Sequence, residues 1–167
     1  MNKTGSRIRS FEPIVDRKSI ILVLGTMPGP EALRKREYYG FRQNHFWRIM
    51  GDLFAAGGPL SYAQKVRLLR QNGIALWDVL QSCEREGAAD SRIRNERPND
   101  VPDLLARHPN IKAVYFNGKS AAKLFIKYFG DKRVRPPARS LPSTSPANAG
   151  ISFEAKRKAW SIIKRCC

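Results

Sequence analysis

Three short stretches of the chain combine small residues, hydroxyl groups and amides, and this combination suits contact with a ligand. They are GTMPGP at residues 25–30, FNGKS at 116–120 and LPSTSPAN at 141–148. Glycine and proline fix irregular, exposed turns whose backbone N–H groups can donate to a ligand. Serine and threonine hydroxyls donate in the same way to phosphate oxygens. These stretches are therefore the first candidates for a binding site.

A fourth stretch, YYGFRQNHFWRIM at residues 38–50, places the neutral amide of Asn44 between aromatic and basic residues and an apolar stripe. The side chain can cap a helix over residues 45–54, because asparagine accepts hydrogen bonds from the N–H groups of a first helical turn. It can also face outward into a cleft and contact a substrate. Local sequence leaves both roles open, and one residue at a helix start can fill both.

The three small-residue stretches also have simpler interpretations. GTMPGP can be an ordinary turn between a strand and a helix, because its glycines lack the GxGxxG spacing of a dinucleotide site. Asn117 can cap a helix that begins near Lys119, and LPSTSPAN can be a surface loop. We reject a nucleotide hydrolase, because a phosphate-binding loop ending in Gly118-Lys119-Ser120 needs glycine where this chain has Ala113.

The hydrophobic pattern predicts a scaffold for these stretches. Residues 19–25, 74–80 and 111–118 are apolar on both faces, which is typical of central parallel strands. A short fourth strand is expected at Arg139–Leu141. Helices are predicted from apolar spacing and capping residues within 26–40, over 45–54, over 61–73 from Ser61 to Gly73, over 101–108 after Asn99 or Asp100, over 119–130 and over 153–165.

Strands that alternate with helices predict an α/β fold with a mostly parallel sheet. The polar segment 82–100 is expected to be a long loop. One domain is predicted over residues 18–167, after a basic, partly mobile lead-in at 1–17. In sheets of this kind ligands bind at the carboxyl edge, where strands end and loops begin. The three small-residue stretches all fall on that edge.

The charge of the chain indicates the class of its ligand. Lys and Arg number 31 against 14 Asp and Glu, which gives a formal charge of +17 and a pI near 10.5. The expected partner is a polyanion, and nucleic acid is the first choice. An anionic membrane surface is the alternative, with residues 153–165 as a weak candidate for a basic amphipathic helix.

Cysteine and histidine are too few for a metal centre or a disulfide framework. The chain contains Cys83, Cys166, Cys167, His45 and His108, and no two cysteines have CxxC spacing. Neither zinc nor an iron–sulfur cluster is therefore expected. The polar start of the chain has no apolar signal segment, so we expect a protein of the reducing cytoplasm.

The order of these blocks resembles the uracil-DNA glycosylase superfamily, and within it most closely the hypoxanthine (deoxyinosine) DNA glycosylases, relatives of the mismatch-specific uracil glycosylases. The resemblance covers about residues 18–165. Its blocks are GTMPG after the first strand, YYG and NHFWRI, GIALWDVLQSCEREG, VYFNGKSAAKLF, and LPSTSPANA. It implies a three-layer α/β/α domain with a short, mostly parallel central sheet. It also implies a monofunctional DNA glycosylase that flips out a deaminated base, favours hypoxanthine, hydrolyses the N-glycosidic bond and so initiates base excision repair.

The resemblance assigns the catalytic role to Asn44. In much of the superfamily an acidic residue or asparagine in the first loop positions the attacking water, but this chain has Met27 at that place. In the hypoxanthine-type enzymes the active asparagine follows the YY pair, as Asn44 does, and we expect its carbonyl oxygen to hold the water. One departure is Phe41-Arg42 in place of the expected His-Pro, which bears on loop shape and substrate range.

The resemblance also implies the remaining site residues. The expected base pocket consists of Gly25, Thr26, Met27, Pro28, Gly29, Tyr39, Phe46 and Asn117. The expected DNA contacts are Arg42, Gly118, Lys119, Ser143, Thr144, Ser145, Pro146, Ala147 and Asn148, of which the last three would fill the gap left by the base. No metal or other cofactor is expected. The partner would be double-stranded DNA with a deaminated or mispaired base, bound by a nucleoid-associated monomer.

Two alternatives stay open at this point. One is a glycosylase of the same fold that acts on uracil or on thymine opposite guanine. The other is a basic nucleic-acid-binding module without catalysis, which explains the charge but not the three small-residue stretches on one edge of the sheet.

Overall fold

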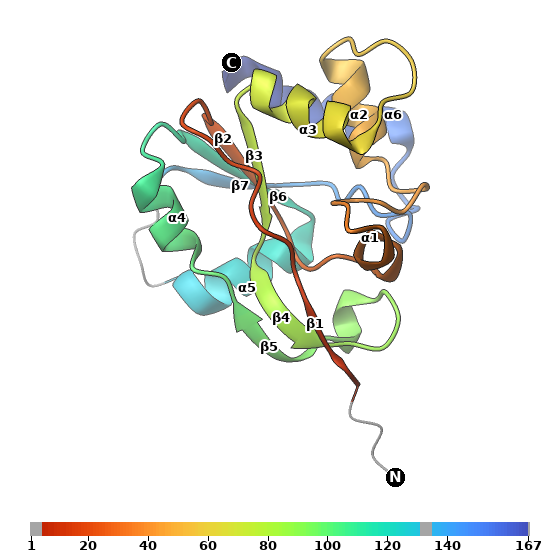
Figure 1. Ribbon diagram of the computed structural model, residues 1–167, viewed down its shortest axis with the longest axis vertical. Coiled ribbons are helices and arrows are strands. Elements are labelled where there is room, and N and C mark those ends of the chain that lie inside the picture. The colour runs from red at the N-terminus through yellow and green to blue at the C-terminus, as the bar shows by residue number, and fades with distance from the viewer. Residues whose placement is uncertain (1–4, 131–134, 167) are drawn as a thin grey trace.

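A four-stranded parallel sheet forms the centre of the computed structural model, which describes residues 5–130 and 135–166. The strands β2 (Ile21–Gly25), β3 (Ile74–Asp78), β6 (Ala113–Asn117) and β7 (Ala138–Leu141) lie in the order β3-β2-β6-β7. All neighbouring pairs are parallel. The predicted strands are thus confirmed, with ends shifted by one or two residues (Figure 1).

Helices cover both faces of this sheet. Side chains of β2 alternate, with Ile21 and Val23 on one face and Leu22 and Leu24 on the other. The helices on the first face are α2 (Phe46–Leu53), α3 (Tyr62–Gln71) and α6 (Phe153–Trp160), and those on the second are α4 (Val101–Arg107) and α5 (Lys119–Phe129). Figure 1 shows the two groups on opposite sides of the strands. The predicted three-layer α/β/α architecture is confirmed.

Capping residues determine where several helices begin. Ser61 and Gln64 form a capping box at the start of α3, in which each side chain accepts from the other residue's backbone N–H. Asp100, one of the two predicted caps of α4, accepts from the Asp103 N–H. Asn99 has a different role, because its side chain donates to the carbonyl groups of Asp78, at the end of β3, and of Leu80, at the start of the strand that follows.

The sequence does not predict the second, antiparallel sheet. It consists of β1 (Arg7–Arg9), β4 (Leu80–Glu84) and β5 (Arg94–Pro98), with β4 in the middle. The prediction of a long loop over 82–100 is therefore wrong, and the described part of the expected lead-in contributes a strand to the fold. Polar side chains dominate β1 and β5, so the apolar alternation that marks a half-buried strand is missing there.

Three short helical elements complete the described chain: α1 (Pro30–Lys35) and the 3-10 helices η1 (Asp90–Arg92) and η2 (Ser161–Cys166). The amphipathic segment expected over 153–165 corresponds to α6 and η2. Its apolar residues Trp160 and Ile163 are fully buried in the core against the central sheet. No helix among the described residues has the length and apolar character needed to cross a membrane.

The carboxyl ends of the four parallel strands lie in one row. Gly25 at the end of β2 pairs with Asp78, and Asn117 at the end of β6 pairs with Leu141. The three small-residue stretches leave the sheet from this row, as predicted. Their loops are therefore neighbours, although up to about a hundred residues separate them along the chain.

Candidate active site

Three side chains from three segments form a hydrogen-bonded bridge at the carboxyl edge of the sheet. Asn117 contacts Thr144 twice: its Nδ2 donates to Thr144 Oγ1, and its Oδ1 accepts from the Thr144 N–H, both at 2.9 Å. Thr144 Oγ1 in turn donates to Asn44 Oδ1 at 2.8 Å. We call Asn117, Thr144 and Asn44 the amide bridge. It joins the loop after β7 to the end of β6 and to the segment before α2.

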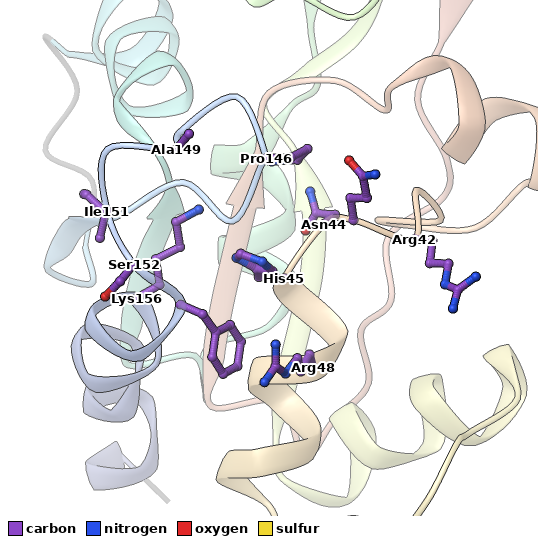
Figure 2. A pocket seen from close by; sticks show the side chains of 11 residues that line it. Arg42, Asn44, His45, Arg48, Pro146, Ala149, Ile151, Ser152 and Lys156 are labelled. Atoms are coloured by element: carbon purple, nitrogen blue, oxygen red, sulfur yellow. The ribbon is translucent and has the colours of Figure 1, made fainter.

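The bridge fixes the orientation of the Asn44 amide. Asn44 Oδ1 also accepts from the Phe46 N–H at 3.0 Å. Because a backbone N–H can only donate, the amide atom that faces it must be the oxygen. Two donors thus occupy the two acceptor positions of Oδ1, and Asn44 presents the two N–H donors of Nδ2 to a ligand. Figure 2 shows this nitrogen directed away from helix α2, on the side of Pro146.

The two capping interpretations have different outcomes. The expected N-cap position of Asn44 is off by one residue: His45 is the N-cap of α2, and Asn44 precedes it and accepts from the Phe46 N–H. Asn117 does not cap α5, since the helix follows Gly118 without a side-chain cap and the Asn117 amide is bonded to Thr144. We expected the side-chain oxygen of Asn44 to hold a water, but this oxygen already accepts hydrogen bonds from Thr144 and from the Phe46 N–H.

Short-range hydrogen bonds shape the loop after β7. Ser143 Oγ accepts from the Ser145 N–H and Ser145 Oγ from the Ala147 N–H, each at 3.2 Å, while Asn148 Nδ2 donates to the Ser143 carbonyl. Gly118 lies against this loop with a φ of 95°, and a Cβ there would come within 2.9 Å of Ser143 Cβ. The loop therefore has its shape before a ligand binds, and position 118 has no room for a side chain.

The loop after β2 is packed inward. Gly25, Thr26, Met27 and Pro28 are all buried. Met27 belongs to a small apolar cluster with residues of β4, rather than to an open wall. The guanidinium of Arg85 donates to the Pro28 carbonyl at 2.6 Å. These contacts hold the loop against the second sheet.

Two titratable side chains, Tyr39 and Asp78, lie close to Gly25 at the start of this loop. A Cβ at that position would lie 2.8 Å from Tyr39 Oη and 2.6 Å from Asp78 Oδ1, so only glycine fits. Burial, followed by the nearby Asp78 carboxylate, raises the pKa of Tyr39, whose hydroxyl has no hydrogen-bond partner in the described chain. Burial also raises the pKa of Asp78 to about 7, although Ser10 Oγ donates to its Oδ2 at 2.6 Å.

Two open hollows, each of about 560 Å³, lie on either side of Asn44. The aromatic hollow is the one that Tyr39, Phe41, Trp47 and Pro59 line. Asn44 lines both hollows. The catalytic candidate therefore faces open space on two sides, and it does not point into the core.

The second hollow is cationic. We call it the cationic hollow and define it by Arg42, His45, Arg48, Ser152, Phe153 and Lys156, which line it together with Asn44 and residues of the loop after β7. Figure 2 shows Lys156 reaching from α6 into this hollow, with Arg48 on the neighbouring helix α2. The Arg48 guanidinium carbon stands 3.7 Å from the centre of the Phe153 ring.

The chain is similar to known proteins over nearly its whole length. Residues 13–164 match the profile described as the uracil DNA glycosylase superfamily. The chain belongs to this superfamily. The expected class of enzyme, a DNA glycosylase that hydrolyses N-glycosyl bonds, is thereby confirmed at the level of the family.

Among the described residues, no group of three or more His, Cys, Asp or Glu side chains is arranged to hold a metal ion.

Individual relatives agree with this family. A protein of Methanosarcina acetivorans named hypoxanthine DNA glycosylase is 33% identical over 94% of this chain and 98% of its own length. A protein of Methanosarcina barkeri with the same name is 33% identical over 92% and 95%. A candidate uracil DNA glycosylase from Methanosarcina acetivorans, solved by NMR in solution, has a TM-score of 0.80 and 31% identity over 96% of this chain and 99% of that one.

The residues expected to form the base pocket of this glycosylase do not all line open space. Tyr39 lines the aromatic hollow, whereas Phe46 is fully buried and Asn117 is engaged in the amide bridge. Gly29 is the N-cap of α1. Among the expected DNA contacts, Arg42 lines both hollows and Pro146 the cationic one, while Lys119 and Ala147 are exposed. Ser145 and Asn148 are half-buried in the loop after β7.

Sequence reasoning did not single out several polar residues that lie around Asn44. His45, Arg48 and Lys156 form the cationic hollow, but none was singled out as a site residue. His45 and Arg48 lie within the NHFWRI block that contains Asn44, which was a usable signal. Lys156 carried no signal, because a lysine on a basic amphipathic helix is ordinarily solvated. Thr144 was expected only as a DNA contact, yet it is fully buried at the centre of the amide bridge.

Proposed function

We propose that this glycosylase excises a deaminated base from duplex DNA, with hypoxanthine as the favoured substrate, and so initiates base excision repair. Two relatives with 33% identity over nearly the full chain carry the name hypoxanthine DNA glycosylase. Within the structure, the position of Asn44 carries the proposal. It lies between two hollows, and Thr144 and the Phe46 N–H hold its amide in one orientation.

The substrate base must first leave the duplex stack, at a cost of about a few kcal/mol that is lowest for a mispaired base. The aromatic hollow offers ring surfaces on which an everted base can stack. Phe41 stands at its rim and is 42% exposed. Tyr39 lines this hollow while its hydroxyl lies against Gly25, so it connects the hollow with the loop after β2. The base would enter at this junction.

Asn44 would act as a hydrogen-bond donor. Cleavage of the N-glycosidic bond leaves positive charge on the sugar and negative charge on the departing base. Asn44 cannot remove a proton from water, because an amide is not basic, and its oxygen is already bonded twice. Its Nδ2 can donate to an acceptor atom of the departing base, where charge develops. Water then adds to C1′, and the base leaves with one of the water's protons.

The other two residues of the amide bridge would position Asn44 without touching the substrate. Asn117 holds Thr144 by two hydrogen bonds, and Thr144 holds Asn44. A fixed donor needs no reorganisation when the charge develops, which is the source of its catalytic value. The reaction needs no covalent intermediate, so we propose a monofunctional glycosylase without a cofactor.

The DNA duplex would lie across the basic surface around this edge. A formal charge of +17 suits the grip on phosphates. The hydroxyl groups of Ser143 and Ser145 can donate to the DNA backbone, as can Lys119. Pro146, Ala147 and Asn148 would enter the space that the base vacates. We propose that the enzyme works as a monomer on nucleoid DNA in the cytoplasm.

A substrate panel tests the proposed function. Duplexes that carry hypoxanthine, uracil, xanthine or thymine opposite guanine are incubated with excess enzyme, and alkaline treatment cleaves the strand wherever a base was released. Hypoxanthine should be released fastest, and Asn44→Ala should lower its release by about two orders of magnitude while the variant still binds DNA. Faster release of uracil would favour the second candidate activity, which the description of the NMR structure suggests. Release of no base would leave the binding-module alternative.

A further inference from the structure

The cationic hollow has no negatively charged lining residue. Arg42, Arg48 and Lys156 line it together with neutral polar and apolar side chains, and no Asp or Glu is among its lining residues. The aromatic hollow on the other side of Asn44 differs, since Glu37 and Asp52 offset part of its charge. Arg42 and Arg48 line both hollows, so Lys156 is the cation that belongs to the cationic hollow alone.

Lys156 is the least compensated of these cations. It is 1% exposed, and its Nζ donates to one acceptor, the Ser145 carbonyl at 3.2 Å. No ion pair of the described chain includes it. Burial accordingly lowers the pKa of Lys156. A buried ammonium group without an anion is costly, so natural proteins rarely keep one unless an anion completes the site.

His45 is a second unsatisfied group beside it. Its Nδ1 is buried and has no hydrogen-bond partner in the described chain. Burial, and then the positive charges of Lys156 and Arg48, lower the pKa of His45. An anion between these residues would accept from Lys156 and Arg48, and it would offset the repulsion that adds to burial in lowering the pKa of His45. The Phe153 ring packs edge-on against His45 and holds it in place.

The hollow also receives the start of α6. Ser152 caps this eight-residue helix through its hydroxyl, which accepts from the Ala155 N–H. The first-turn N–H groups and the positive end of the helix dipole add to the field of the three cations. This contribution supports the side-chain observations and does not stand alone.

The hollow is directly connected to the catalytic candidate. Lys156 is bonded to Ser145, the neighbour of Thr144, and Thr144 is bonded to Asn44. The His45 N–H donates to the Thr144 carbonyl at 3.0 Å. An anion in the hollow would therefore lie within about one nucleotide of the group that Asn44 contacts, and the open volume of about 560 Å³ admits a phosphate with its sugar.

We propose that the cationic hollow binds one phosphate group of the DNA backbone, adjacent to the nucleotide presented to Asn44, through Lys156, Arg48 and Arg42. This proposal rests on the proposed function, because it takes the DNA to lie across the same edge. The bound phosphate supplies the counter-charge that Lys156 lacks in the free protein. The hollow thus fixes the register of the damaged strand.

The first test pairs Lys156→Met with Lys158→Met, because Lys158 is an exposed lysine on the same helix. Binding is measured by fluorescence anisotropy with a duplex that carries a stable abasic analogue, so base release is not required. Lys156→Met should bind roughly tenfold more weakly and lower the slope of log affinity against log salt by about 0.9. Lys158→Met should change both much less. Equal effects of the two variants would overturn the proposal.

The second test locates the phosphate. Single methylphosphonate groups, which are uncharged, replace the phosphates on either side of the abasic analogue one at a time. At one position the substitution should weaken binding of the wild type roughly tenfold and leave binding of Lys156→Met unchanged. If every position weakens both proteins equally, the hollow does not bind the backbone.

Two further measurements distinguish loss of DNA binding from misfolding, and binding of the DNA backbone from binding of a free anion. Lys156→Met should melt at the same or a higher temperature than the wild type, since it removes an unpaired buried charge. If that variant does not fold, Arg48→Met takes its place, because Arg48 is exposed and its loss leaves the core intact. Inorganic phosphate should raise the melting temperature of the wild type but not of the variant. Stabilisation by phosphate without coupling to any methylphosphonate position would overturn the assignment to DNA.

Discussion

The amide bridge and the cationic hollow meet at Asn44, but their polar groups are in opposite states. Thr144 in the bridge is fully buried, and its N–H, hydroxyl and carbonyl groups all have protein partners. Lys156 in the hollow is equally buried, yet it has one carbonyl partner and no anion. A satisfied network fixes geometry, whereas an unsatisfied one is prepared for a ligand. In the proposed mechanism, the amide bridge therefore positions Asn44 and the cationic hollow binds DNA.

The largest effect should be the dependence of DNA affinity on salt concentration. Affinity for a duplex should fall roughly a thousandfold between 50 and 200 mM salt, because bound phosphates release their counterions. Anisotropy titrations at several salt concentrations measure this slope. An affinity that stays flat across the range would show that the charge of +17 does not grip the backbone.

Asn44→Asp keeps the hydrogen bonds of the amide bridge but removes the two N–H donors of Asn44. One carboxylate oxygen can still accept from Thr144 and from the Phe46 N–H, but the other replaces the amide donors with negative charge. We expect single-turnover excision to fall by about two orders of magnitude or more, since the departing base also gains negative charge. Asn44→Ala is the matched control and should lose a similar factor. Activity at or above the wild-type level in Asn44→Asp would mean that the site needs an acceptor for water.

Thr144→Val tests whether positioning depends on one hydroxyl group. Valine fills the same space, but it leaves Asn117 Nδ2 without its acceptor and Asn44 Oδ1 with one donor fewer. Urea unfolding should show a loss of about 1–3 kcal/mol, and single-turnover excision should fall roughly tenfold. Thr144→Ser keeps the hydroxyl and should recover most of the excision rate. If both variants lose the rate equally, the methyl group matters and the hydrogen bonds do not.

The smallest effect concerns Asp78, the buried carboxyl beside Gly25. Its pKa is raised to about 7 from an ordinary value of 3.8, so the folded state favours the protonated form. Its stabilising contribution is complete below about pH 4 and is lost as the pH rises through about 7. Asp78→Asn cannot ionise, so the free energy of unfolding should decline less over this range than in the wild type.

Urea midpoints at steps between pH 4 and pH 8 measure this difference. Asp52→Asn serves as the control, because Asp52 is exposed and its substitution should leave the pH dependence unchanged. Identical pH profiles for Asp78→Asn and the wild type would mean that burial of Asp78 does not penalise its charge.

Much of the architecture could be predicted because its signals are local. The central strands are short apolar runs, and the caps of α3 and α4 lie within three residues of the groups they bond. The same logic identified the carboxyl edge, since parallel strands end together. The small antiparallel sheet escaped prediction because β1 pairs with β4 about 75 residues away and both carry polar side chains.

The sequence by itself determined the α/β scaffold, the basic surface and the three loops at one edge. Hydrophobic periodicity, composition and turn residues can each be recognised within short stretches of the chain. Tertiary structure alone decided which atoms of those loops meet. Asn44 and Thr144 are 100 residues apart in sequence, and no local pattern specifies that the Thr144 hydroxyl orients the Asn44 amide. The same holds for Lys156, which is an ordinary helical lysine until the fold buries it beside His45. Hydrogen-bond polarity and the loss of water around a charge arise from packing, so they appear only when the chain is folded.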